Sequence, residues 1–216
     1  MPDIFDEVEQ DLRAERTKRF LMRYAGVLIG LIVLVIAGAG GWQVWKNHQQ
    51  MERMRTSDAY QAAQLLADNP SPDRPAAIAA LAKLAGEGNP GYRTLAELRE
   101  AALKADGGDL TGASALWDQV AGNSDTPPLL RDLASLLWAM HHIDTPQSGE
   151  VAARLQPLLA ADNPWHALAG EMQAVLDIKQ GETDAARSAL KQLAQDITAP
   201  AGVRGRANGL LQQLGG

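Results

Sequence analysis

An uncharged run near the N-terminus is the strongest feature of the hydropathy pattern. From Tyr24 to Trp45, 22 consecutive residues carry no charge, and Val, Ile and Leu dominate the centre of the run. As a helix, this run would span about 33 Å, which matches a hydrocarbon core of roughly 30 Å. We therefore expect one transmembrane helix over residues 24–45, with Tyr24 at one membrane interface and with Trp42 and Trp45 at the other.

The charges that flank this run predict its orientation. Five Lys or Arg residues precede it, and three follow within the next ten residues. This bias favours a cytoplasmic segment at residues 1–23 and places residues 46–216 on the opposite side of the membrane. Within the span, Gly26 and Gly30 form a small-xxx-small pattern that could bring a second helix close.

A cleavable signal peptide is the alternative interpretation of the uncharged run. The small residues 37–39 would be a plausible cleavage site. The run is long for the apolar part of a signal peptide, and the segment before it is a polar stretch rather than a short basic one. We therefore favour a retained membrane anchor.

A repeat occupies the rest of the chain. Residues 108–121 align with residues 181–194 without a gap, and glycine, acidic, alanine and glutamine positions coincide at an offset of 73. Half of that offset is close to the 34-residue tetratricopeptide unit. Two weaker copies, one before residue 108 and one between the matched segments, fall at about this spacing. The four anchor positions that we assign are 36, 39 and 34 residues apart: Ala77, Ala113, Ala152 and Ala186.

Each copy fits the second helix of a helical hairpin. Alanine at the anchor allows close approach of the two helices, and a larger residue four positions on, such as Trp117 or Leu190, would fill the space between units. The clearest first helix has apolar residues at helical spacing: Trp165, Leu168, Ala169, Met172, Val175 and Leu176. A generic helical bundle would also use alanine and leucine at such spacings.

Proline-containing turns divide this part of the chain into units. We expect a capping helix at the end of the stack, because the last hairpin would otherwise expose an apolar face. The predicted hairpins cover about 50–87, 91–122, 127–161 and 164–197, and the capping helix covers 200–214.

Composition agrees with an all-α fold. The chain is 46% hydrophobic but only 5% aromatic, which disfavours a β-sandwich or barrel. A net charge of −6 argues against nucleic acid as a partner. We therefore predict a single transmembrane helix followed by an α-solenoid of about four tetratricopeptide-like hairpins and a C-terminal capping helix.

Catalytic and metal-binding motifs are not found in the sequence. There is no cysteine, no H-E-x-x-H and no G-x-S-x-G, and the adjacent His141 and His142 would point apart on a helix. Glu97 and Glu100 are assigned to a solvated helix face. We expect a protein that is not an enzyme and that has no cofactor, no metal and no small-molecule substrate.

A binding surface is the remaining candidate for function. Stacked hairpins have a concave side, lined chiefly by first helices, that receives an extended peptide or a partner helix. We expect Trp138 and Trp165 in the core. The exposed interaction candidates are residue types that often dominate interfaces: Arg55, Tyr60, Tyr92, Arg93, Arg99 and Arg131.

Several segments resemble one known family. They are Gly41-Trp42-Gln43-Val44-Trp45-Lys46-Asn47-His48-Gln49, Lys18-Arg19-Phe20, Ala59-Tyr60-Gln61 and Ala186-Arg187-Ser188-Ala189. Together they are similar to the YfgM-type ancillary subunits of the bacterial Sec translocon, and the start Met1-Pro2-Asp3-Ile4-Phe5 resembles the alphaproteobacterial versions.

This resemblance implies a single-pass protein of the bacterial inner membrane with a cytoplasmic N-terminus and a periplasmic C-terminal domain. It further implies a place beside the SecYEG channel, often with the membrane-anchored chaperone PpiD. There the protein would help pass translocated polypeptides to periplasmic chaperones.

Two other classes of function are compatible with the sequence, because a tetratricopeptide fold does not dictate its partner. One is a membrane-anchored scaffold for another envelope process, such as cytochrome maturation or cell division. The other is a soluble periplasmic binding protein that signal cleavage releases.

Overall fold

The computed structural model describes residues 4–69 and 73–215, although most side chains before Leu34 lie outside this description. The described residues form nine α-helices and one 3-10 helix. In chain order these elements are α1 (Ile4–Asp68), α2 (Arg74–Glu87), α3 (Pro90–Asp106), α4 (Leu110–Gly122), α5 (Pro128–His142), α6 (Ser148–Leu155), η1 (Gln156–Leu159), α7 (His166–Gln180), α8 (Thr183–Gln195) and α9 (Ala201–Gln213).

The chain divides into two compact units, Met1–Arg55 and Thr56–Gly216, and helix α1 contributes residues to both. In the first unit, the rings of Trp42 and Trp45 are exposed, with centroids 5.3 Å apart. Gly26 and Gly30 are exposed as well, and the side chain of Tyr24 lies outside the described residues.

Helix α1 runs through the expected span at 24–45 without a break. Within the part of the chain that could be searched, no helix combines the length and the apolarity needed to cross a bilayer. The transmembrane helix therefore stays a prediction.

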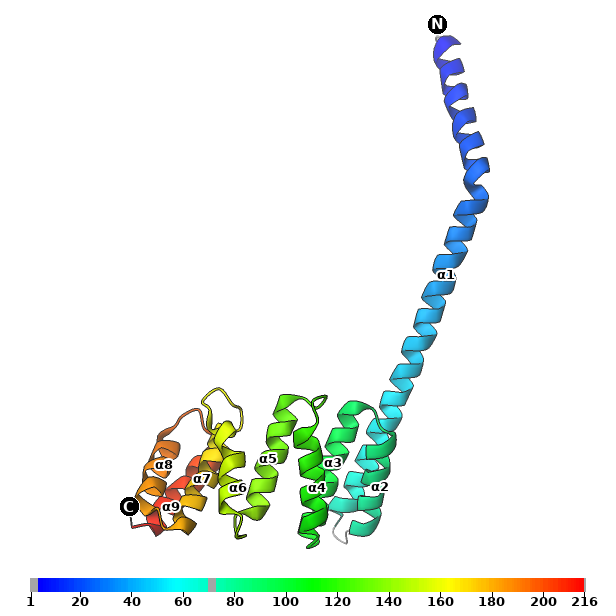
Figure 1. The fold of residues 1–216 in the computed structure, drawn as a ribbon. Helices are drawn as coiled ribbons and strands as arrows, with labels where there is room; N and C mark the ends of the chain where they lie inside the picture. Colours follow the sequence, from blue (N-terminus) through cyan, green and yellow to red (C-terminus); the bar gives the residue numbers. More distant parts are fainter. Residues whose placement is uncertain (1–3, 70–72, 216) are drawn as a thin grey trace. The chain divides into compact units, whose positions relative to one another are not determined.

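The second unit is a stack of helical hairpins that follow one another in chain order (Figure 1). The end of α1 pairs with α2, α3 with α4, α5 with α6 and η1, and α7 with α8, and each hairpin packs against the next. These pairs match the four hairpins predicted from the repeat.

Local sequence explains where these helices begin. The side chains of Asp73, Asn89 and Asp109 accept hydrogen bonds from backbone N–H groups in the first turns of α2, α3 and α4. Proline occupies the first turn of α2, α3 and α5, where its missing N–H costs nothing. The Asn-Pro and Pro-Pro pairs thus end one hairpin and start the next.

The second helices share a buried triplet at positions i, i+4 and i+7. Trp117 and Leu190 each occupy the middle position, completely buried, as predicted. The triplets are Ala77, Leu81 and Leu84 in α2; Ala113, Trp117 and Val120 in α4; Val151, Leu155 and Leu158 in α6 and η1; and Ala186, Leu190 and Leu193 in α8.

This triplet corrects one anchor. Val151 is completely buried, whereas the expected anchor Ala152 is only partly buried. The anchors 77, 113, 151 and 186 are therefore 36, 38 and 35 residues apart. The prediction of Ala152 was wrong because it aligned alanine with alanine. The repeats keep the spacing of their buried side chains instead, and this spacing places Val151 at the anchor.

The first helices share a different signature, a pair of completely buried alanines five residues apart. These pairs are Ala96 and Ala101 in α3, Ala134 and Ala139 in α5, and Ala169 and Ala174 in α7. Each first helix packs against its own second helix and against the last elements of the preceding hairpin, so burial covers more than one stripe. This explains why only Ala169 and Leu176 of the expected stripe are buried, while its other members are half-buried.

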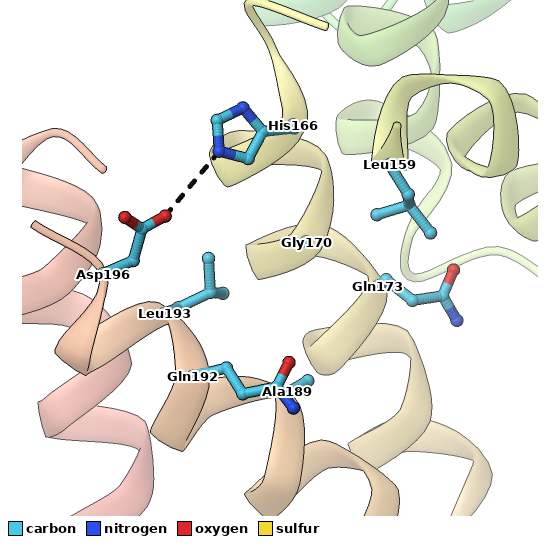
Figure 2. Close-up of a pocket in the computed structure, with 8 residues that line it drawn as sticks. All are labelled: Leu159, His166, Gly170, Gln173, Ala189, Gln192, Leu193 and Asp196. Carbon is cyan, nitrogen blue, oxygen red and sulfur yellow. Dashed lines mark ion pairs between the residues drawn. The ribbon is translucent and has the colours of Figure 1, made fainter. Parts of the chain in front are cut away.

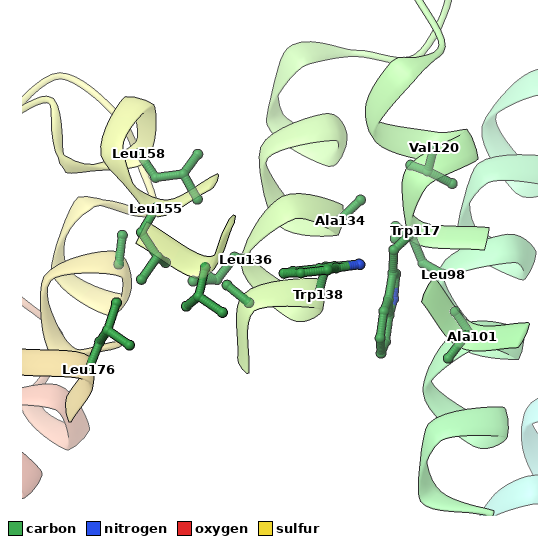
Figure 3. Packing of buried hydrophobic residues seen from close by; sticks show 14 residues of the cluster. Leu98, Ala101, Trp117, Val120, Ala134, Leu136, Trp138, Leu155, Leu158 and Leu176 are labelled. Carbon is green, nitrogen blue, oxygen red and sulfur yellow. The ribbon is translucent and has the colours of Figure 1, made fainter. Parts of the chain in front are cut away.

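Large side chains fill the spaces between hairpins in the main core cluster (Figure 3). Trp117 is completely buried and Trp138 is 3% exposed, which confirms the core assignment of Trp138. Trp165 is half-buried against the same cluster, and its indole N–H donates to the carbonyl of Leu129 at 2.9 Å.

Helix α9 closes the stack, as expected of a capping helix. Its Val203 and Ala207 are buried against α7 and α8. Arg206 binds both carboxylate oxygens of Glu171 on α7, at 2.5 and 2.6 Å, and Glu171 is 3% exposed. This ion pair fixes the cap to the last hairpin.

Candidate binding site

The three complete first helices carry equivalent residues on the face that lies between successive second helices. The equivalence follows from the buried alanine pairs, which place Glu97 of α3, Ser135 of α5 and Gly170 of α7 at the same position. One turn further on, the residues are Glu100, Trp138 and Gln173. These positions form the floors of three neighbouring sites with different chemistry.

In the second hairpin, two carboxylates occupy this floor. Glu97 accepts a hydrogen bond from the side-chain amide of Gln119 at 2.9 Å, and Glu100 lies 3.9 Å from the ammonium of Lys104. Both glutamates are more than nine-tenths buried, so their assignment to a solvated face was wrong. Burial raises the pKa of Glu97, and the charge of Arg93 and the hydrogen bond from Gln119 oppose part of this increase. Burial likewise raises the pKa of Glu100.

In the third hairpin, Trp138 is held between charged and aromatic neighbours. The His142 ring stacks on it with centroids 3.7 Å apart and planes 4° apart. The guanidinium of Arg154 lies 3.9 Å from the centre of the indole ring and also pairs with Asp118 at 2.7 Å and Glu150 at 2.9 Å. This cation–π and ion-pair network joins α4 to α6 across α5.

A pocket of about 410 Å³ opens at this network. It brings the Ser114 hydroxyl to 3.2 Å from Nε2 of His142, whose Nδ1 lies 2.8 Å from the carbonyl of Trp138. The hydroxyl also lies 2.7 Å from the carbonyl of Leu110, so it can donate its proton either to this carbonyl or to Nε2 of a neutral His142 ring. These hydrogen bonds fix the orientation of the His142 ring.

In the fourth hairpin, a pocket of about 470 Å³ lies between η1 and α8, with α7 as its floor (Figure 2). His166 and Asp196 face one another at its rim, with Nε2 of His166 3.7 Å from Oδ2 of Asp196. Hydrogen bonds from Thr198 hold the pKa of Asp196 below its usual range. The lining residues are Leu159, His166, Gly170, Gln173, Ala189, Gln192, Leu193 and Asp196.

Three of the six predicted interaction residues come together at the first hairpin. The rings of Tyr60 and Tyr92 are 5.7 Å apart, and Arg99 forms an ion pair with Asp68. Burial raises the pKa of Tyr60, and the charge of Arg99 opposes this shift. All three side chains are half-buried, so they join α1 to α3 as well as offering part of their surface to a partner.

The other three candidates lie apart from this group. Arg93 is exposed and acts on the nearby Glu97, and Arg131 is half-buried on α5. Arg55 belongs to the first unit, where it pairs with Glu52 at 3.1 Å.

Sequence reasoning missed the pocket of the fourth hairpin. The signal was present in the offset of 73, which aligns Gly170 with Glu97 and Gln192 with Gln119. The first of these pairs lies outside the ungapped match, and the buried alanine pairs of α3 and α7 establish it. Among the described residues, no group of three or more histidine or acidic side chains is placed to hold a metal.

The stacked hairpins and their capping helix define an α-solenoid of the class that binds other proteins. A family model described as a tetratricopeptide repeat-like domain matches residues 18–212, and the chain belongs to this family. No curated protein and no solved structure matches the chain.

Proposed function

We propose that this protein is a membrane-anchored scaffold that binds other polypeptides through its repeat domain. The observation that supports this most directly is the row of equivalent sites along a tetratricopeptide-like stack, two of which open as pockets. Such domains act through protein–protein contacts, and pockets between repeats are where partner side chains anchor.

The membrane anchor rests on the uncharged run at 24–45 and on its aromatic ends. In the proposed arrangement, the first 23 residues are cytoplasmic and the repeat domain lies in the periplasm of a bacterium. The segments that resemble YfgM-type subunits favour a place beside the SecYEG channel, where the domain would help pass translocated polypeptides to a PpiD-like or soluble periplasmic chaperone.

Affinity purification from membranes tests this proposal. The full chain should recover the Sec channel and a periplasmic chaperone, and a variant without residues 1–45 should lose the channel. Recovery of cytochrome-maturation or division proteins instead would support the second class of scaffold. Recovery of neither group would refute the translocon assignment.

Mass spectrometry of the mature protein tests the anchor separately. We expect the intact N-terminal segment, residues 1–23, to be present in the membrane fraction. A mature chain that begins after residue 39 would show that the uncharged run is a signal peptide and that the domain is released.

A further inference from the structure

The fourth hairpin contains the site of the second hairpin with its central side chain removed. The offset of 73 that relates the two hairpins pairs Glu97 with Gly170 and Gln119 with Gln192. In the second hairpin, Glu97 is 6% exposed and accepts the hydrogen bond from Gln119. The chain thus provides both a filled and an open version of one site.

The open version has space and an unused donor. A methyl group at Gly170 would lie 3.5 Å from Cδ2 of Leu193, an ordinary van der Waals contact, and the pocket of about 470 Å³ extends beyond it. Gln192 is exposed, and its side-chain amide makes no hydrogen bond within the described part of the chain, whereas its counterpart Gln119 donates to Glu97. A partner can therefore supply the carbonyl oxygen that Gly170 lacks.

The charges around the pocket select a neutral group. Arg93, which faces Glu97, is replaced by His166, and Asn123 is replaced by Asp196. The imidazole of His166 faces the Asp196 carboxylate at the rim, and a second carboxylate, Asp177, accepts a hydrogen bond from Gln173 at 2.7 Å. An incoming carboxylate would meet the like charge of Asp196 at the rim, whereas an uncharged amide would not be repelled.

We propose that this pocket binds a glutamine side chain of a partner polypeptide. The aliphatic stem of that side chain lies between Leu159 and Leu193 over Gly170, and its carbonyl oxygen accepts the hydrogen bond from Gln192 (Figure 2). The second hairpin provides the precedent, because the side chain of Glu97, which has the same length as that of glutamine, fills the same position there. This assignment rests on the proposed function as a polypeptide-binding scaffold.

A substitution within the chain tests whether the pocket fits this group. Gly170→Gln should place a carboxamide where Glu97 lies in the second hairpin and should raise the Tm of the full chain in detergent above that of Gly170→Ala. Gly170→Ala is the matched control, since it adds at least as much helix propensity as glutamine without the carboxamide. The gain should disappear when Gln192→Ala is combined with Gly170→Gln. A gain that survives Gln192→Ala, or no gain at all, would contradict the proposed hydrogen bond.

A small probe tests binding directly. N-acetylglutamine amide, titrated into the full chain, should shift the methyl NMR signals of Leu159 and Leu193. Its affinity should fall about tenfold in Gln192→Ala, which removes one hydrogen bond to the probe. Gly170→Gln should abolish binding, because the pocket is then occupied.

The corresponding glutamate and leucine amides distinguish the alternatives. Equal or tighter binding of either amide would overturn the assignment to glutamine, as would the absence of any shift with the glutamine probe. Because no partner protein is needed, this result is independent of the membrane purification. Failure of the probe to bind would overturn the pocket assignment alone, and failure of the membrane purification would overturn the translocon assignment alone.

Discussion

Overpacking the last hairpin is the most direct test of the repeat packing. Ala186 is completely buried at the start of the triplet that continues with Leu190 and Leu193. Ala186→Leu adds three carbons at a point where α7 and α8 are in contact, so the helices must separate or the new side chain must take a strained rotamer. The neighbouring Ala185 is exposed on the same helix and provides a matched control.

The expected loss can be scaled from this geometry. Inserting methylene groups into a packed core costs about 1–3 kcal/mol. For a unit of this size, each kcal/mol lowers the Tm by about 2–4 °C, so Ala186→Leu should lower it by about 2–12 °C. Ala185→Leu changes only exposed surface and should stay within about 0.5 kcal/mol of the parent.

Thermal unfolding of the full chain in detergent, followed by circular dichroism, measures both variants. A clear fall for Ala186→Leu with no change for Ala185→Leu supports the packing. Equal melting temperatures for the two variants would show that position 186 does not lie at a close contact, and the assigned register of the last repeat would then be wrong.

Three further substitutions test other parts of the stack by the same measurement. Val151→Ala should lower the free energy of unfolding by about 1–3 kcal/mol, because it leaves a cavity at the corrected anchor. An unchanged free energy would show that Val151 is not the anchor and would favour Ala152. Arg206→Ala should lower the free energy of unfolding by about 3 kcal/mol, because it leaves the buried Glu171 carboxylate without its partner, whereas the guanidinium that is removed is half exposed. An unchanged free energy would show that this ion pair does not fix α9 to the stack. Glu97→Gln should stabilise the chain at neutral pH and have little effect below about pH 4, and the opposite pattern would contradict the raised pKa of Glu97.

The pH dependence at Glu97 follows from the sign of its pKa shift. Burial raises the pKa in the folded chain above its unfolded value. The stability that the protonated side chain contributes is therefore complete below the unfolded pKa, and it is lost as pH rises through the folded pKa. Glutamine cannot ionise and still accepts from Gln119, so Glu97→Gln removes this loss. Urea unfolding at a series of pH values measures this effect: the free energy of unfolding should depend less on pH in Glu97→Gln than in the parent chain.

Helical periodicity and turn chemistry were sufficient to predict the hairpins. The buried triplets repeat at nearly regular spacing, and prolines such as Pro90 and Pro128 mark where first helices begin. The internal register was less accessible, because alanine is abundant in this chain and identity alone does not distinguish Ala152 from the buried Val151. Spacing of large apolar residues at i+4 and i+7 would have found the correct anchor.

Burial of polar residues was the part that periodicity could not predict. Glu97 and Glu100 look like a solvated face in the sequence, yet the second helices α2 and α4 cover them. Their cover comes from residues such as Gln119, 22 positions away, so no local pattern reports it. In a stack, the exposure of a first helix depends on the hairpins on both sides.

The same repeat that predicts the fold also indicates where to look for function. Positions that agree between copies, such as Ala96 and Ala169, maintain packing and say nothing about partners. A position where the copies differ, as Glu97, Ser135 and Gly170 do, changes the chemistry of a site while the helices around it stay in place. Gly170 is the most marked of these differences, because glycine lowers the helix propensity and leaves the exposed Gln192 amide without a partner side chain. A loss of this kind within a packed repeat is most simply explained by a side chain that comes from another polypeptide.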